Sequence, residues 1–226
     1  MQRSEHSTPR CWLHLKNISF IANKGDYIAV VGESGCGKST LLEIIYGLLH
    51  IEKGTVFWND EKLLGPNFYL IPGEDFMKYL PQDFDLMPYI TVEENIGKNI
   101  SSQDPSKQQR IEELLEVVDM SEFLKTKVKN LSGGQKQRLG IARAIVREPH
   151  MYIFDDSFSA LDYKTDKLLR QELNDKLPNA TKFIVAQRIG TVIKADKIVV
   201  IEKGKIACVG THGELLENCE IYKEIA

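Results

Sequence analysis

A run of eight residues combines three glycines, a lysine and a serine at spacings that suit phosphate binding. Residues 32–39 read Gly-Glu-Ser-Gly-Cys-Gly-Lys-Ser and fill every fixed position of the phosphate-binding loop pattern G-x-x-x-x-G-K-[ST]. The glycines let consecutive backbone N–H groups turn inward around phosphates. Lys38 can reach the outer phosphates of a nucleotide, and the Ser39 hydroxyl can bind Mg²⁺. The spacing therefore predicts a nucleotide site.

The segments on both sides of this loop are those that a phosphate loop requires. Residues 27–31 form a short apolar run rich in β-branched side chains, which is typical of a buried strand, and residues 40–45 begin a helix. The N-terminus of that helix adds a partial positive charge beside bound phosphates. The flanking strand and helix therefore favour a true phosphate loop over a chance match to the pattern.

Two carboxylates follow a second buried strand. Residues 151–154 are a continuous apolar run that ends in Asp155 and Asp156, which is typical of a central parallel strand with carboxylates at its C-terminal edge. Residues 182–186 repeat the apolar run. A carboxylate placed beside the phosphate loop can hold Mg²⁺ directly or through water.

Two helices are predicted in the middle of the chain. In residues 106–118, apolar side chains recur at i, i+3, i+4 and i+7, which predicts an amphipathic helix packed against a core. Ser132 is a good N-cap for a second helix that should continue to about Arg147, before Pro149 stops it.

Further strands are predicted at residues 16–20, 55–58 and 78–80, and a pair of strands joined by a tight glycine turn at 197–209. Strands that alternate with helices around a phosphate loop indicate an α/β core. The two helices then belong to a mainly helical insertion at about residues 83–140.

Composition limits the remaining possibilities. The 226 residues suffice for one substantial core, and 27% charged with 42% hydrophobic residues is ordinary for a soluble globular protein. A net charge of −3 does not favour nucleic acid as a partner. No apolar stretch reaches the ~20 residues that span a bilayer, and the first residues contain no signal-peptide core, so we expect a cytosolic chain. The four cysteines show neither zinc spacing nor a disulfide framework.

Three further motifs identify a family. Residues 131–135 read LSGGQ, residues 151–155 have the form of a Walker B strand, and Gln82 follows a predicted strand. With residues 159–162 (SALD) just beyond the Walker B strand, the chain resembles the nucleotide-binding domain of an ATP-binding cassette (ABC) transporter over most of its length. The resemblance implies a single domain, residues 1–226, with a RecA-like P-loop NTPase core, an antiparallel β portion and a helical signature subdomain, that binds and hydrolyses ATP.

The resemblance assigns roles to individual residues. ATP is expected to contact the phosphate loop and the residue after it: Gly32, Glu33, Ser34, Gly35, Cys36, Gly37, Lys38, Ser39 and Thr40. Mg²⁺ is expected at Ser39, Gln82 and Asp155, and Gln82 is also expected to sense an attached membrane domain. The signature residues are expected to contact ATP held by a second subunit, so that two cassettes enclose it: Leu131, Ser132, Gly133, Gly134 and Gln135. Lys38, Asp156 and Gln187 are the expected catalytic residues.

Two of those catalytic positions depart from the family pattern. Asp156 stands where the family has a glutamate that positions the attacking water, and a carboxylate displaced by about 1 Å or more can lower the rate on the order of 10²-fold. Gln187 replaces the switch histidine, and an amide carries neither a proton nor a charge to the γ-phosphate. The two changes resemble the degenerate sites of heterodimeric ABC exporters and predict slow hydrolysis at this chain's own site.

The adenine contact and the two halves of the chain are also unusual. No aromatic residue lies at residues 4–8, where the family's adenine-stacking side chain belongs, which leaves Trp12 as the nearby candidate. Residues 82–95 resemble importer-like or lipoprotein-release cassettes, whereas residues 156–162 and 210–216 resemble multidrug-type exporters. A hybrid chain is one interpretation of this mixture.

The resemblance further implies partners and a location. We expect a second ABC ATP-binding domain, in a homodimer or heterodimer, and a transmembrane domain or subunit that would place the chain at the inner face of a membrane. Two alternatives stay open: a regulatory module that dimerises on ATP with little hydrolysis, and a soluble ABC protein without a transport role.

Overall fold

The computed structural model describes residues 15–69, 71–146, 148–158, 161, 163–186 and 189–226. Its centre is a six-stranded sheet with the strand order β4-β5-β6-β1-β7-β8. The strands are β1 (Tyr27–Val31), β4 (Met77–Leu80), β5 (Met151–Phe154), β6 (Thr181–Val185), β7 (Lys197–Glu202) and β8 (Lys205–Gly210). All neighbours pair in parallel except β7 and β8, which are antiparallel. The predicted α/β core is confirmed.

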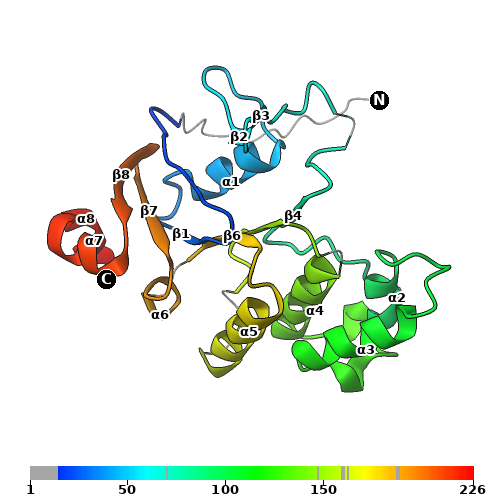
Figure 1. Ribbon diagram of the computed structural model, residues 1–226. Helices are drawn as coiled ribbons and strands as arrows, with labels where there is room; N and C mark the ends of the chain where they lie inside the picture. The colour runs from blue at the N-terminus through cyan, green and yellow to red at the C-terminus, as the bar shows by residue number, and fades with distance from the viewer. Residues whose placement is uncertain (1–14, 70, 147, 159–160, 162, 187–188) are drawn as a thin grey trace, which may run out of the picture.

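Helices cover both faces of this sheet (Figure 1). Helix α1 (Lys38–Tyr46) lies on one face, where it packs with Ile28 and Val30 of β1. Helices α4 (Gly133–Ile145), α5 (Tyr163–Lys176) and α6 (Ile189–Val192) lie on the other face, which Ala29 and Val31 share. Because alternate residues of each strand are buried on opposite faces, β1 is apolar throughout, as its continuous run predicts.

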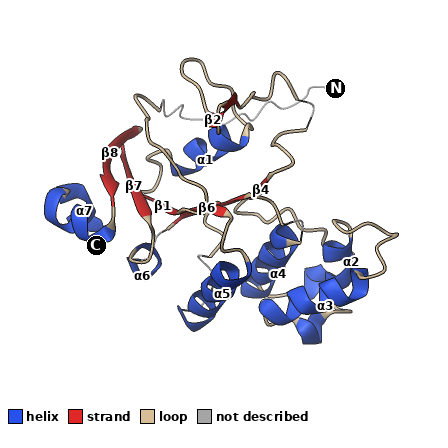
Figure 2. Cartoon of the chain, viewed as in Figure 1, coloured by secondary structure: helices blue, strands red, loops and turns tan. Residues whose placement is uncertain are grey.

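The helical part of the chain lies between β4 and β5 and extends to one side of the sheet (Figure 2). It contains α2 (Val92–Gly97), α3 (Lys107–Val117), two short 3₁₀ turns, η1 (Ser121–Phe123) and η2 (Val128–Asn130), and α4. Helix α3 confirms the amphipathic segment predicted at 106–118. Buried side chains of α2, α3 and α4 belong to the same apolar cluster as Tyr152 and Phe154 of β5. The helical segment therefore shares the core of the sheet, and α4 continues past residue 140.

The strand predicted at residues 16–20 was wrong. No strand is assigned there, although the backbone N–H of Lys16 donates to the Gly204 carbonyl oxygen at 2.8 Å. An apolar run forms a strand only where a neighbouring backbone is available along its length, which the sequence does not show. Residues 55–58 yield only the short β2 (Phe57–Trp58), paired with β3 (Glu61–Lys62).

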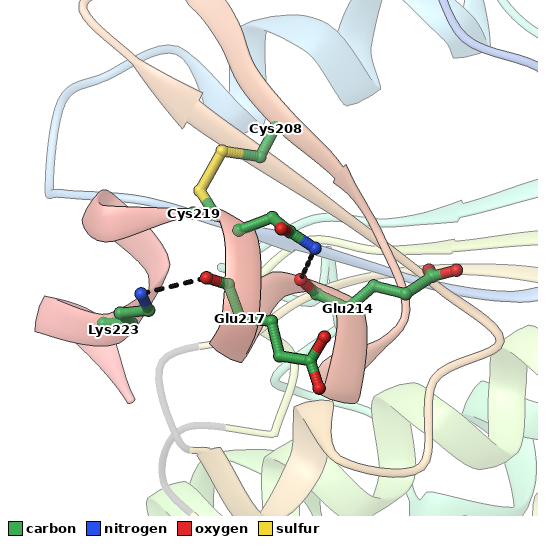
Figure 3. The surroundings of a disulfide bond; sticks show 6 residues. Cys208, Glu214, Glu217, Cys219 and Lys223 are labelled. Atoms are coloured by element: carbon green, nitrogen blue, oxygen red, sulfur yellow. Dashed lines mark hydrogen bonds between the residues drawn. A yellow bond between two sulfur atoms is a disulfide. The ribbon is translucent and has the colours of Figure 1, made fainter.

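The C-terminal end corrects the cysteine prediction. Cys208 on β8 and Cys219 form a disulfide 11 residues apart in the sequence. Cys219 lies between α7 (His212–Asn218) and α8 (Glu220–Ile225), as Figure 3 shows. The chain turns back from β8 into α7, which brings the two cysteines together. Their spacing in the sequence does not predict this geometry. Closing such a loop contributes about 2–3 kcal/mol by restricting the unfolded chain.

Candidate nucleotide-binding site

The phosphate loop connects the C-terminal end of β1 to α1. Gly32 has φ 147°, and a Cβ built there would lie 2.2 Å from the carbonyl oxygen of Ile201 on the neighbouring strand β7. Gly37, the N-cap of α1, has φ 112° and offers no side-chain cap. The first position therefore needs glycine because β7 approaches closely, and the second leaves the helix N-terminus open to a ligand.

Lys38 lies folded over this loop. Its Nζ donates to the carbonyl oxygens of Gly32 at 2.9 Å and Glu33 at 2.7 Å. The Cys36 carbonyl oxygen accepts from Gly204 N at 3.1 Å, which attaches the loop to the turn between β7 and β8. Glu33, Ser34 and Gly35 are exposed. The ammonium group thus lies at the mouth of an open loop whose base is fixed by the sheet.

Two of the three predicted metal residues meet beside the loop. Ser39 Oγ donates to Asp155 Oδ1 at 2.9 Å, and Asp155 is 6% exposed. Gln82 lies just beyond β4 with an exposed side chain, and among the described residues it forms no hydrogen bond with either partner. One carboxylate and one hydroxyl suit Mg²⁺, which binds through few protein ligands together with substrate phosphates. No cluster of three or more acidic, histidine or cysteine ligands occurs in the described ranges.

The structure adds Tyr79, which the sequence did not suggest. Its hydroxyl donates to Asp155 Oδ2 at 3.0 Å, and its ring stacks on Tyr46 of α1 with centroids 5.3 Å apart. Burial, and then the charge of Asp155, raise the pKa of Tyr79 far above its ordinary value, so the hydroxyl remains a donor at all physiological pH values. Both carboxylate oxygens of Asp155 are therefore held by hydroxyl groups.

Of the predicted catalytic residues, Asp156 lies at the end of β5. Asp156 directly follows Asp155, is partly buried and has a left-handed φ of 50°, a conformation that costs on the order of 1–3 kcal/mol for a non-glycine residue. Gln187 lies outside the described residues, as do Trp12, Ser159, Ala160 and Asp162. The nearest described residue to Gln187, Ala186, donates its N–H to the Val30 carbonyl oxygen at 3.1 Å, at the end of β1 that carries the phosphate loop.

The signature residues form a separate surface. Ser132 caps α4 through a capping box: its Oγ accepts from Gln135 N at 3.3 Å, and Gln135 Oε1 accepts from Ser132 N at 2.8 Å. Ser132 and Gly133 are exposed, whereas Leu131 is buried. No hydrogen bond between described residues joins this segment to the phosphate loop. The structure joins Ser39 to Asp155 and folds Lys38 over its own loop, and the signature takes no part in these hydrogen bonds.

A buried arginine connects α4 to the segment after Gln82. Arg143 Nη2 donates to the Phe84 carbonyl oxygen at 2.7 Å and lies 3.5 Å from Asp85 Oδ2. Gly140 makes room for Phe84, since a Cβ there would lie 3.1 Å from Phe84 Cβ. Burial lowers the pKa of Arg143, and Asp85 partly opposes that shift. The helix that begins with the signature is thereby tied to the Gln82 segment.

Known proteins share both sequence and fold with this chain. Residues 15–159 match the family model described as ABC transporter. An uncharacterized ABC transporter ATP-binding protein of Mycobacterium tuberculosis is 36% identical over 231 residues, which cover 94% of this chain and 38% of that protein. The sn-glycerol-3-phosphate import ATP-binding protein UgpC of Rhizobium meliloti is 35% identical over 210 residues, 90% of this chain and 59% of that protein. The chain thus spans only part of the length of these relatives.

Two solved structures are similar in fold to this chain. An ATP-binding cassette in a dimeric post-hydrolysis state with ADP and Pi has a TM-score of 0.77 at 26% identity, over 87% of this chain and 90% of that chain. A bacterial Atm1-family ABC exporter with ATP bound has a TM-score of 0.78 at 24% identity, over 89% of this chain and 36% of that chain, a likeness of fold. The predicted RecA-like cassette fold is confirmed. Throughout the described ranges, each helix is too short or too polar to cross a membrane.

Proposed function

The chain belongs to the family of ABC transporter ATP-binding domains, which are ATPases, and from this premise we propose that it drives a membrane transporter as one half of an ATP-enclosing dimer. The observation that carries the proposal is the 2.9 Å hydrogen bond from Ser39 Oγ to Asp155 Oδ1. It joins the phosphate loop to the Walker B carboxylate across 116 residues of sequence, at the open N-terminus of α1.

The residues around this bond fit a Mg²⁺·ATP complex. Ser39 and Asp155 would hold the metal ion, and Gln82, exposed just beyond β4, would be a third ligand. The ion supplies neutralisation of charge on the outer phosphates. Lys38 now donates to two loop carbonyl oxygens, so it must exchange them for phosphate oxygens when ATP binds. The loop amides and the N-terminus of α1 complete the cradle.

We expect Tyr79→Phe to raise the Mg²⁺ concentration at half-maximal ATP binding about tenfold, because hydrogen-bond partners that orient a metal ligand typically contribute 10- to 100-fold to metal affinity. The change removes only the hydroxyl that holds Asp155 Oδ2. Titration of Mg²⁺ at fixed ATP, with Mn²⁺ binding followed by electron paramagnetic resonance, measures the shift. Tyr69→Phe, an exposed tyrosine, is the matched control. An unchanged metal midpoint would show that Asp155 is held without Tyr79.

The exposed signature supports the dimer. Ser132 and Gly133 present the N-terminus of a 13-residue helix to solvent, and such an end binds anions well. The segment is not engaged by its own phosphate loop, so a second cassette offers the γ-phosphate that it would contact. A second cassette could be a copy of this chain or a related chain. The dimeric state of the similar ADP-bound cassette agrees with this proposal.

We propose that this chain's own site hydrolyses ATP slowly. Asp156 is shorter than the family's glutamate, and Gln187 cannot carry charge to the γ-phosphate. The signature is complete in the sequence and would serve a partner's competent site. A regulatory module that uses ATP only to dimerise is the second candidate, and the same two residues favour it.

Asp156→Glu combined with Gln187→His should raise the single-turnover rate of the homodimer at least about tenfold, since a misplaced catalytic group typically costs 10²- to 10⁴-fold. Each change alone should recover less, because residues that act as a unit are not additive. ATP affinity should change little. Quenched-flow hydrolysis on wild type, both single variants and the double variant measures this. A wild-type rate equal to that of the double variant would contradict the slow site.

The membrane partner would meet the segment after Gln82. Arg143 ties that segment to α4, so a displacement there is transmitted to the helix that carries the signature. We propose a location at the inner face of a membrane, held through the transmembrane partner. Reconstitution with a candidate membrane subunit, followed by co-purification, tests this step separately from hydrolysis.

A further inference from the structure

An ion-pair network under the sheet lies against the segment that follows Asp156. Arg170 of α5 donates from Nε to Asp166 Oδ1 at 2.6 Å and from Nη1 to the Tyr27 hydroxyl on β1 at 3.0 Å. Its guanidinium carbon lies 3.9 Å from the centroid of the Phe158 ring. The arginine side chain is 14% exposed and that of Asp166 is 7% exposed. One arginine thus joins α5, β1 and the residues after the Walker B strand.

Burial of this network is not explained by stability alone. Removing a charged pair from water costs about as much as the pair's attraction returns, so an apolar pair of the same size would fill the space equally well. Unlike an apolar side chain, a planar guanidinium fixes the orientation of the groups around it. Its edge donates hydrogen bonds in set directions, and its face stacks on a ring. The three contacts of Arg170 use both the edge and the face.

The segment that Arg170 contacts, Ser157 and Phe158, is also held by other contacts. Ser157 Oγ donates to the Leu80 carbonyl oxygen at 3.1 Å, and the Phe158 ring packs edge-on against Phe154 at 5.3 Å. Between these residues and Asp155, Asp156 keeps its left-handed φ of 50°. A strained residue retains such a conformation only where its surroundings fix the chain on both sides. Asp155 fixes one side, and Ser157 with Phe158 fixes the other.

We propose that Arg170 is a positioning residue for ATP hydrolysis: by holding the Phe158 ring against α5, it keeps Asp156 in its left-handed backbone conformation directly after Asp155. This inference rests on the proposed role of Asp156. It assigns a function to a side chain of α5, a helix on the opposite face of the sheet from α1.

The test variant is Arg170→Met, which keeps the length of the stem and removes the charge and the planar head. We expect the single-turnover rate to fall at least about tenfold, because displacements of about 1 Å at a reacting group have large effects. ATP affinity should stay within about twofold, and hydrogen exchange in peptides containing residues 156–158 should become faster. Arg170→Lys should recover part of the rate, and Tyr27→Phe, which removes one anchor, should lose only a few-fold.

Controls separate this role from folding and from the proposed function. Arg110→Met on α3 removes another partly buried arginine, which donates to the Val146 carbonyl oxygen at 2.8 Å, and it should alter stability without altering the rate. Asp156→Asn tests the carboxylate directly: a wild-type rate in that variant would refute its catalytic role, and exchange at residues 156–158 would still report on Arg170. A folded Arg170→Met protein with wild-type rate and wild-type exchange would overturn the inference. If Arg170→Met does not fold, Arg170→Lys and Tyr27→Phe decide it by the same two measurements.

Discussion

Lys38→Ala is expected to weaken ATP binding at least about 100-fold, which corresponds to about 2.7 kcal/mol. Hydrogen bonds from a charged donor contribute about 1.5–3 kcal/mol each, and Lys38 is placed to give more than one to the outer phosphates. It already reaches two carbonyl oxygens of the loop, Gly32 and Glu33, at 2.9 and 2.7 Å. After its loss, the loop amides, the helix N-terminus and the metal ion must neutralise the phosphates without a lysine. Equilibrium titration with a fluorescent ATP analogue measures the change.

The matched control is Lys205→Ala, which removes an exposed lysine from β8. It leaves the net charge equal to that of Lys38→Ala, so a general electrostatic effect would weaken both variants alike. Circular dichroism and thermal melting should show that both proteins fold. Unchanged ATP affinity in a folded Lys38→Ala protein would refute the assignment of residues 32–39 as the phosphate loop.

Ser132→Arg is expected to abolish ATP-induced dimers while leaving ATP binding by the monomer nearly intact. The Ser132 side chain is exposed at the first turn of α4, and a bulky side chain there would block the approach of a γ-phosphate held by another subunit. A shift of at least about 30-fold in the dimer dissociation constant follows if this contact is central to the interface, since central contacts often contribute 2 kcal/mol or more. Light scattering with and without Mg²⁺·ATP measures it.

Loss of the helix cap must be separated from the steric block. Ser132→Ala removes the hydroxyl that accepts from Gln135 N, at a cost of about 1 kcal/mol to the helix, but adds no bulk. Dimers should therefore survive in Ser132→Ala and fail in Ser132→Arg. An Asp156→Asn background is expected to slow hydrolysis and so to keep ATP bound during the measurement. Dimers that persist in Ser132→Arg would place the interface elsewhere.

Local sequence determines the parts of the site that are contiguous in the chain. The phosphate loop needs only eight neighbouring residues, since glycines at fixed positions and a following helix set its path. The Ser132 cap with Gln135 is equally local, and α3 follows from the spacing of its apolar residues. The position of Asp155 is also predicted from local sequence, because an apolar run that ends in a carboxylate is typical of the end of a buried strand. The prediction of a strand at residues 16–20 was wrong because a strand also requires a neighbouring strand to pair with, and its own residues do not specify one.

Only the tertiary structure decided which distant side chains support that site. Tyr79 reaches Asp155 across 76 residues, Arg143 reaches Phe84 across 59, and Arg170 reaches Tyr27 across 143. These contacts depend on the strand order β4-β5-β6-β1, which sets β4 beside the Walker B strand, and on the packing of α4 and α5 beneath it. Strand order is decided by the burial of the whole core, and many residues contribute to the free energy of that burial. No single segment of the sequence therefore predicts the strand order. The loop at residues 32–39 can therefore be predicted from the local sequence. The side chains that orient Asp155 come together only when the sheet forms.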